Sequence, residues 1–282
     1  MKKKAFSLVE LSIVILIIGI LIAGVTQSSR LVEQFKLSAA RSKTKSSPVN
    51  SIKGLSMWLE AVSIESFLES ETEDQATVSI WNDIGLQGYK TNATQNSTTN
   101  RPAYTTKCIN GLPCLRFNGS SSFLNYDAAF LVNSNFSIFI VEQRRNDTGN
   151  SPNYFIGGAN EVDNGLLHLG YKTNIKLTFS QYNNNFSANT TGYSNPVPKI
   201  HSYVLNQGVG RNYFIDGVSF ISETNSTPLS SYDSAQIGAY GNSSASYFDG
   251  DIAEIIMFNR ALNSEERKSV ESYLSEKWNI KI

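Results

Sequence analysis

A long apolar run near the N-terminus constrains this 282-residue chain more than any other feature. It extends from Phe6 to Val25, follows three lysines and Ala5, and contains one acidic residue, Glu10. A helix rises about 1.5 Å per residue, so the run is long enough to cross a hydrocarbon layer of roughly 30 Å. Basic residues beside such a span stay in the cytoplasm, so we expect the chain after Val25 to lie outside.

The lone carboxylate of Glu10 needs a compensating interaction. Near the centre of a bilayer it costs on the order of 2.5 to 3.5 kcal/mol, and less near the headgroups. One interpretation is an uncleaved signal anchor, with Glu10 at the interface. The other interpretation is that Glu10 pairs with a cation. Cleavage before Phe6 creates a positive amine about one helical turn away, and in a fibre the amine of an incoming subunit can pair instead with Glu10 of its neighbour.

The residues Lys-Lys-Lys-Ala-Phe-Ser-Leu-Val-Glu resemble the leader of type IV prepilins and pseudopilins. In that family a short basic leader is removed just before the phenylalanine and the new N-terminus is methylated. The resemblance implies cleavage between Ala5 and Phe6, N-methylation of Phe6 and an assembly role for Glu10. The family usually has glycine where this chain has Ala5. The implied partners are a prepilin peptidase, other pilin-like subunits and the bacterial inner membrane, which the chain would cross once before assembly into a surface pilus.

The N-terminal helix is expected to continue past the apolar run. No proline precedes Pro48, and an apolar stripe at helical spacing continues through Leu31, Val32, Phe35 and Ala39. Polar residues, proline and glycine then predict a linker. The expected organisation is a leader, a transmembrane and assembly helix, a linker and one domain, at residues 1–5, 6–46, 47–53 and 54–282.

Charge is unevenly distributed along the chain. Residues 30–53 contain six basic residues and one acidic residue, whereas residues 54–282 contain 15 basic and 22 acidic residues, a net charge of −7. An acidic domain lacks the basic face that nucleic-acid binding requires, so we expect no nucleic acid as a partner. The basic segment suits contact with phospholipid or neighbouring subunits, or is a solvated helix face.

Two cysteines, Cys108 and Cys114, flank a turn-forming Asn-Gly pair. In an exported domain they predict a local disulfide, and a pair of free buried thiols is the alternative.

The composition of residues 54–282 favours one large, mainly β domain with two packed antiparallel sheets. Short apolar runs alternate with turn residues. Asp216-Gly217 predicts a hairpin. Expected strands lie at 136–142, 166–171, 175–181, 201–206, 212–216 and 251–258. A C-terminal helix is predicted from a capping box, Asn263 with Glu266, and from an apolar face formed by Val270, Tyr273, Leu274 and Trp278.

Several motifs of this domain resemble, in order, the laminin G-like branch of the concanavalin A-like jelly rolls. They are Gly54-Leu-Ser-Met-Trp-Leu-Glu-Ala61, Ile80-Trp-Asn-Asp83, Arg101-Pro102, Asn110-Gly-Leu-Pro113, Leu115-Arg-Phe-Asn-Gly119, Phe136-Ser-Ile-Phe-Ile-Val141 and Tyr247-Phe-Asp-Gly-Asp-Ile-Ala-Glu-Ile-Ile-Met-Phe-Asn-Arg-Ala-Leu262. The family implies an antiparallel jelly roll that often binds carbohydrate or protein, sometimes with calcium. No cofactor is required, and the sequence spacing identifies no metal site. The candidate calcium ligands are Asp83, Asn118, Asp127 and Asp249.

One predicted strand carries candidate catalytic residues, which are Asp249, Asp251 and Glu254. Jelly-roll glucanases use a Glu-x-Asp-x-x-Glu strand, and retaining hydrolysis needs two carboxyls about 5 to 5.5 Å apart. Glu254 is expected on the opposite face from the two aspartates unless a bulge intervenes. The chain has Asp where the motif has its first Glu, and we expect no enzyme. His168 and His201 are expected as ordinary strand residues.

A sugar-binding platform is the remaining candidate site, because tyrosine rings stack on sugars and amides hydrogen-bond to them. Polar loops without a ligand have the same composition. The candidates are Tyr182, Asn183, Asn184, Asn185, Asn189, Tyr193 and Tyr240.

Three functional hypotheses are consistent with these sequence features. The expected one is a minor pilin that displays its head for adhesion or surface recognition, with a glycan or a surface protein as ligand. The alternatives are a pseudopilin of a type II-like secretion system and a jelly-roll glycoside hydrolase.

Overall fold

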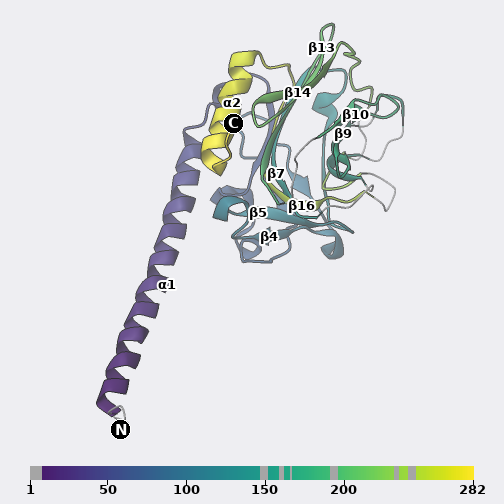
Figure 1. Cartoon of the computed structure of the whole chain (residues 1–282). Coiled ribbons are helices and arrows are strands. Elements are labelled where there is room, and N and C mark those ends of the chain that lie inside the picture. The colour runs from purple at the N-terminus through teal and green to yellow at the C-terminus, as the bar shows by residue number, and fades with distance from the viewer. Residues whose placement is uncertain are drawn as a thin grey trace.

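The structure, a computed structural model, describes residues 8–146, 152–158, 162–165, 167–190, 196–231, 235–240 and 246–282. A long helix, α1 (Leu8–Lys45), projects from a β-sandwich head. A second helix, α2 (Ser264–Trp278), lies beside the C-terminal end of α1 and against the head (Figure 1). Within the described residues, none of the helices has both the length and the apolar character needed to cross a membrane.

Two antiparallel eight-stranded sheets make up the described part of the head. Sheet A follows the order β14 (Val218–Glu223), β13 (Gly210–Ile215), β12 (Lys199–Asn206), β7 (Phe136–Arg144), β16 (Asp249–Phe258), β5 (Cys114–Asn118) and β4 (Ala103–Thr105), with β1 (Leu55–Glu60) also paired to β16. Sheet B follows the order β11 (Ser187–Asn189), β10 (Lys176–Gln181), β9 (Leu167–Thr173), β8 (Asn153–Gly157), β15 (Ala235–Ile237), β6 (Leu124–Tyr126), β3 (Ala93–Thr94) and β2 (Ile80–Trp81).

Apolar side chains form two separate cores. The inner core lies between the sheets and includes Phe117, Phe155, Leu169, Phe179, Tyr203, Ile255 and Met257. The outer core lies between sheet A and the two helices and includes Ala40, Val49, Trp58, Phe139, Ile256, Val270, Leu274 and Trp278. Strand β7 is apolar on both faces because Ile138 and Ile140 enter the inner core while Phe139 and Val141 enter the outer core.

The predicted fold class is confirmed, and the six predicted strands correspond to β7, β9, β10, β12, β13 and β16. The Asp216-Gly217 turn joins β13 to β14, and both residues have positive φ, 48° and 75°, as a two-residue hairpin turn requires. The capping box of α2 is also confirmed. Asn263 accepts hydrogen bonds from the backbone N–H groups of Glu265 and Glu266, and the Glu266 carboxylate accepts one from the backbone N–H of Asn263.

The end of α1 is packed on the head. Ala40 and Thr44 are buried, and Arg41 Nε donates a hydrogen bond to the carbonyl of Val62 over 2.7 Å. Residues 47–53, predicted as a linker, contain a short turn at Val49–Ser51 in which Val49 is completely buried. The stem and the head are therefore joined by a packed segment.

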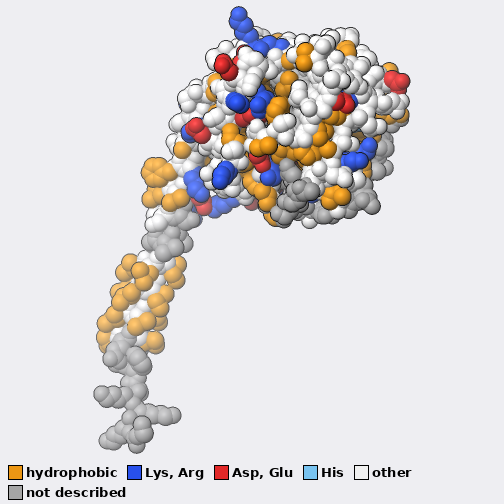
Figure 2. Space-filling view, turned by 45° about the horizontal axis from the view of Figure 1, so that its top comes forward, with side chains coloured by type: hydrophobic (Ala, Val, Ile, Leu, Met, Phe, Trp, Pro, Cys, Tyr) orange, Lys and Arg blue, Asp and Glu red, His pale blue; other side chains and the backbone are white. Residues whose placement is uncertain are grey.

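The free part of α1 exposes large apolar side chains, and Figure 2 shows them gathered around one stretch of the projecting helix. They are Val9, Leu11, Ile13, Val14, Ile15, Leu16, Ile17, Ile18, Ile20, Leu21 and Ile22.

Candidate functional site

The predicted processing site lies at the edge of the described chain. Ala5 and Phe6 are outside the described residues. Glu10 lies in the first turn of α1, and its side chain is not among those described. The interpretation of these three residues therefore rests on the sequence.

Cys108 and Cys114 form a disulfide with Cα atoms 5.8 Å apart. Within their loop, Asn110 has a φ of 52° and its Nδ2 donates a hydrogen bond to the carbonyl of Trp278 over 2.7 Å. The disulfide loop thus binds the C-terminal end of α2. Among the described residues, the one group of three potential metal ligands is the two sulfurs with Asp251. A disulfide has no thiolate to offer a metal, so this group is not a metal site in the oxidised protein.

A bulge in β16 determines the faces of the three acidic residues proposed for hydrolysis. The register with β7 skips Ala253 between Ile252 and Glu254. Ala253 and Glu254 therefore both face the outer core, on the same side of sheet A as Asp251. The bulge that the sequence left open is present.

The acidic residues of β16 already have protein partners. Asp251 is fully buried and accepts hydrogen bonds from Arg116 Nε and Nη2 over 2.7 and 3.0 Å. This bond raises the pKa of Arg116. Asp249 pairs with Arg145 over 3.2 Å and accepts a hydrogen bond from Asn146. A carboxylate that acts as an acid or a nucleophile must reach its substrate, and the buried Asp251 does not face solvent.

Glu254 belongs to a buried polar cluster beneath α2. Its Oε1 accepts hydrogen bonds from Trp58 Nε1 and Tyr273 OH over 2.7 and 2.8 Å. Its Oε2 accepts hydrogen bonds from Trp278 Nε1 and Lys277 Nζ over 2.7 and 2.8 Å. Burial, together with nearby carboxylates, raises the pKa of Tyr273 well above its ordinary value, which keeps its hydroxyl a donor. All four acceptor positions of Glu254 are thereby used.

Lys277 supplies the cation of this cluster. Its Nζ also donates to Glu60 Oε2 over 2.9 Å, and the side chains of Lys277, Glu60 and Glu254 have no exposed area. No sequence motif pointed to this cluster. A signal was present, because Lys277 lies between Leu274 and Trp278 on the apolar face of α2.

Three of the candidate calcium ligands accept hydrogen bonds from backbone N–H groups and so stabilise the loops in which they lie. The two oxygens of Asp83 accept hydrogen bonds from the backbone N–H groups of Trp58, Gly85 and Thr91. Asn118 Oδ1 accepts hydrogen bonds from the backbone N–H groups of the three serines at 120–122. Asp127 Oδ1 accepts a hydrogen bond from the backbone N–H of Ala129. Within the described ranges these side chains act as turn anchors.

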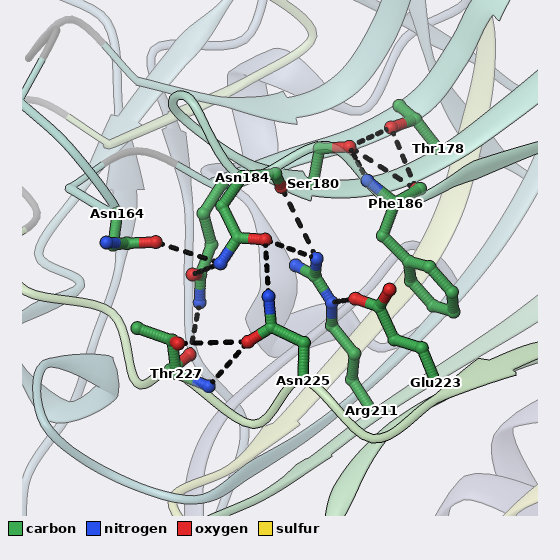
Figure 3. A network of polar contacts seen from close by, with 10 residues as sticks. Asn164, Thr178, Ser180, Asn184, Phe186, Arg211, Glu223, Asn225 and Thr227 are labelled. Atoms are coloured by element: carbon green, nitrogen blue, oxygen red, sulfur yellow. Dashed lines mark hydrogen bonds and ion pairs between the residues drawn. The ribbon is translucent and has the colours of Figure 1, made fainter.

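Part of the predicted sugar platform forms a polar network between the ends of the two sheets (Figure 3). Arg211 from β13 crosses to the turn after β10, where its Nη2 donates to Asn184 Oδ1 over 2.6 Å. Asn184 also accepts a hydrogen bond from Asn225 and donates to Asn164. Arg211 forms an ion pair with Glu223. The network joins the two sheets, because β13 belongs to sheet A and the turn after β10 belongs to sheet B. Arg211 at its centre is only 1% exposed.

The other platform candidates lie around this turn or outside the described chain. Asn183 donates to Asp163, and Asn185 accepts a hydrogen bond from Lys172. Tyr182 is half-buried in the turn, Asn189 is exposed at the end of β11, and Tyr193 lies outside the described residues.

Tyr240 belongs to a different cluster, on the outer face of sheet B. Its ring lies edge-on to His168, with centroids 4.6 Å apart, and 5.7 Å from the ring of Tyr154. Tyr154 stacks on His168. Burial, assisted by Lys172, lowers the pKa of His168 to about 4, so the imidazole is neutral at pH 7.

His201 lies in the inner core, within β12. Its ring nitrogens are 2.6 Å from Tyr213 OH and 2.8 Å from Glu142 Oε1, and all three side chains are buried. Both histidines lie in strands, as predicted.

A groove of about 670 Å³ separates α1 from the head. Arg30, Leu37 and Arg41 line its helix side, and Ile64 and Glu69 lie among the residues of its head side. Its lining combines apolar and charged side chains.

Two family models match the chain. The prokaryotic N-terminal methylation motif matches residues 1–26, and the concanavalin A-like lectin/glucanases superfamily (Laminin_G_3) matches residues 118–266. The predicted fusion of a prepilin-type leader to a concanavalin A-like head is thereby confirmed. No curated protein sequence matches the chain.

Solved structures share the fold of the head at low sequence identity. Trypanosoma rangeli sialidase in complex with sialic acid matches with a TM-score of 0.56 and 17% identity, over 80% of this chain and 33% of the sialidase. This chain thus spans about a third of the sialidase. Domain 4 of AbnA, an extracellular arabinanase from Geobacillus stearothermophilus solved with arabinotriose, matches with a TM-score of 0.50 and 16% identity, over 78% of this chain and 97% of the domain. The binding domain of Paraclostridial Mosquitocidal Protein 1 matches with a TM-score of 0.55 and 15% identity, over 81% of this chain and 53% of that one.

These likenesses show the fold alone. The family match extends over more than half of the chain, and the two-sheet sandwich agrees with it. The chain therefore belongs to the concanavalin A-like lectin/glucanase superfamily.

Proposed function

We propose that this protein is a minor pilin, which is cut before Phe6, assembles through α1 and displays its head for adhesion or surface recognition. The methylation motif implies processing by a prepilin peptidase and assembly with pilin-like subunits. The apolar run of α1 is the segment that would cross the inner membrane before assembly.

The observation that carries this proposal is the arrangement of α1. Its N-terminal part exposes apolar side chains, whereas its C-terminal part is packed on the head. A helix that is apolar all round needs a bilayer or other helices around it. A head that is packed against the end of the same helix keeps a fixed position relative to a helical fibre core. This geometry suits a subunit with its helix inside a filament and its head outside.

The head is proposed as a binding module, without catalysis. Asp251 and Glu254 are engaged in buried hydrogen bonds to basic and aromatic side chains, which supports an anchoring role for both. The arabinanase domain that matches along nearly its whole length was solved with an oligosaccharide, which favours carbohydrate over other ligands.

The test is expression of the full chain with and without a prepilin peptidase. We expect mass spectrometry to find a mature chain beginning with N-methylated Phe6 only when the peptidase is present. We also expect the chain in surface fibres sheared from the cells. A chain that stays uncut in the presence of an active peptidase would contradict the proposal, and a mature chain confined to the periplasm would favour a pseudopilin.

Glu10→Ala tests the assembly role of the carboxylate, with Ser12→Ala as the matched control two positions away. Ser12 Oγ donates only to the local carbonyl of Val9 in the described structure. We expect Glu10→Ala to enter the membrane and to be lost from fibres, because the incoming N-terminal amine has no partner, and Ser12→Ala to assemble normally. Normal assembly of Glu10→Ala would exclude this role.

A further inference from the structure

The outer face of sheet B carries a row of polar side chains at one register level. Thr94 of β3 is paired with Asn125 of β6, Asn125 with Gln236 of β15, and Gln236 with Gly157 of β8. Residues in register on neighbouring strands point to the same face. Asn125 and Thr94 are exposed, and Gln236 is half-buried. The row therefore presents two amides and a hydroxyl to the outside of the head.

Aromatic rings lie beside this row. A Cβ added to Gly157 would lie 2.8 Å from the Cα of Tyr240, so the backbone of Tyr240 passes directly over β8. Tyr240 is half-buried beside His168. Tyr247 forms a β-bridge with the residue before Tyr240, and its half-buried ring lies 6.5 Å from that of Phe123, which immediately precedes β6.

The hydrogen-bonding capacity of the face is incompletely used. Gln236 Nε2 donates to Asn125 Oδ1 over 3.3 Å, while Gln236 Oε1 and His168 Nε2 are shielded from solvent and have no hydrogen-bond partner in the structure. Buried polar groups without a partner are uncommon. A ligand hydroxyl group that reaches either atom would satisfy it.

We propose that Asn125, Gln236 and Tyr240 form the core of a binding site for a neutral oligosaccharide on the outer face of sheet B. This inference deepens the proposed display function and rests on it for its biological setting. Sugar rings stack on aromatic faces, and sugar hydroxyls exchange hydrogen bonds with amides. The site is distinct from the Asn184 network, whose amides are already bonded to one another and to Arg211.

The charge of the row favours a neutral ligand. None of Thr94, Asn125, Gln236 and Tyr240 is charged at pH 7, and the neighbouring His168 is neutral there. A sialic acid or a uronate has a carboxylate that favours a cationic partner, and the row supplies none. The site therefore differs in expected ligand from the sialidases that share the fold.

The test is isothermal titration calorimetry on the full chain in micelles of a detergent without a sugar headgroup. The probes are arabinotriose, xylotriose, cellotriose and chitotriose, with 3′-sialyllactose as the acidic comparison. We expect at least one neutral trisaccharide to bind, and Tyr240→Ala and Asn125→Ala each to weaken that binding about tenfold, as the loss of one ring contact or one amide predicts. Tyr182→Ala and Gln207→Ala are the matched controls, because each removes the same type of side chain elsewhere on the head, and they should bind as the parent chain does.

The outcomes distinguish the proposed sugar site from the proposed display function. Failure of every neutral trisaccharide to bind, or unchanged binding in Asn125→Ala, would overturn the site. Asn125 is exposed, so its truncation should leave the head folded, which circular dichroism checks. Tighter binding of 3′-sialyllactose than of every neutral trisaccharide would also overturn the proposed neutral-sugar site. All four variants should enter sheared fibres like the parent chain, so absence of the parent chain from fibres would refute the display function while leaving the sugar site intact.

Discussion

The Nζ atom of Lys277 lies 2.8 Å from the Oε2 atom of Glu254, and neither side chain has any exposed area. The pair joins α2 to the central strand β16, and Glu60 of β1 binds the same ammonium group. One cation thus holds together two strands and a helix that are distant in sequence.

Replacing Lys277 by methionine should destabilise the head by about 3 to 5 kcal/mol, because it leaves two buried carboxylates without their cation. Urea denaturation of residues 30–282, which keep the packed end of α1, measures the loss. Lys281→Met is the control, because Lys281 is exposed near the C-terminus. Equal stability of the two variants would show that the buried pair contributes no more than a surface charge.

Removal of residues 30–53 should destabilise the head. Val49 and Ala40 are buried in the outer core, so a fragment of residues 54–282 exposes the apolar surface beneath them. Burial of one valine contributes about 1.5 to 3 kcal/mol, so we expect the fragment 54–282 to be at least about 2 kcal/mol less stable than the fragment 30–282. Parallel urea titrations test this, and coincident curves would mean that the stem does not support the head.

The stability of the head should fall at acidic pH through His168. Burial lowers its pKa from 6.5 to about 4 in the folded state, so the unfolded state binds the proton more readily. The contribution of neutral His168 is present above pH 6.5 and is lost as the pH falls towards 4, by about 3 kcal/mol in total.

His168→Phe keeps a ring between Tyr154 and Tyr240 and removes the titration. Between pH 7 and pH 4 the parent fragment should lose about 3 kcal/mol more stability than this variant. Chemical denaturation at each pH measures both curves, and Lys172→Met checks the smaller effect of the nearby cation on the histidine. Parallel pH curves for the parent and His168→Phe would refute the prediction.

The disulfide should stabilise the head by about 2 kcal/mol, because it closes a short loop in the unfolded chain. The double variant Cys108→Ser with Cys114→Ser should unfold at lower urea than the oxidised parent. The reduced parent should match the double variant, which serves as the control for the substitutions themselves. If the reduced parent unfolds like the oxidised one, the link contributes nothing.

Local patterns predicted much of the fold. The capping residues of α2, the Asp216-Gly217 turn and the Cys108–Cys114 link each depend on residues close together in the chain, and all three are present. The predicted strands also lie within a few residues of the observed ones. Segment 47–53 differs from a free linker because Val49 finds a place between α1 and sheet A, which one valine among polar residues does not reveal.

The candidate sites depended on pairings that local patterns do not contain. Glu254 shares a face with Asp251 only because Ala253 bulges out of register with β7. Tyr240 appeared in the sequence as one member of a polar platform, yet the structure separates it from Asn184 and places it beside His168. Asn125 and Gln236 belong to no sequence motif, and only the pairing of β6 with β15 brings them together.

The sequence by itself determined that the chain has a prepilin-type leader, an apolar N-terminal helix, a mainly β head and a capped C-terminal helix. Such features follow from the side-chain periodicity and turn chemistry of neighbouring residues. Only the tertiary structure decided that α1 is packed on the head, that Lys277 is buried between two carboxylates, and that Asn125 meets Gln236. These contacts join residues far apart in the chain, and strand register and core packing bring them together.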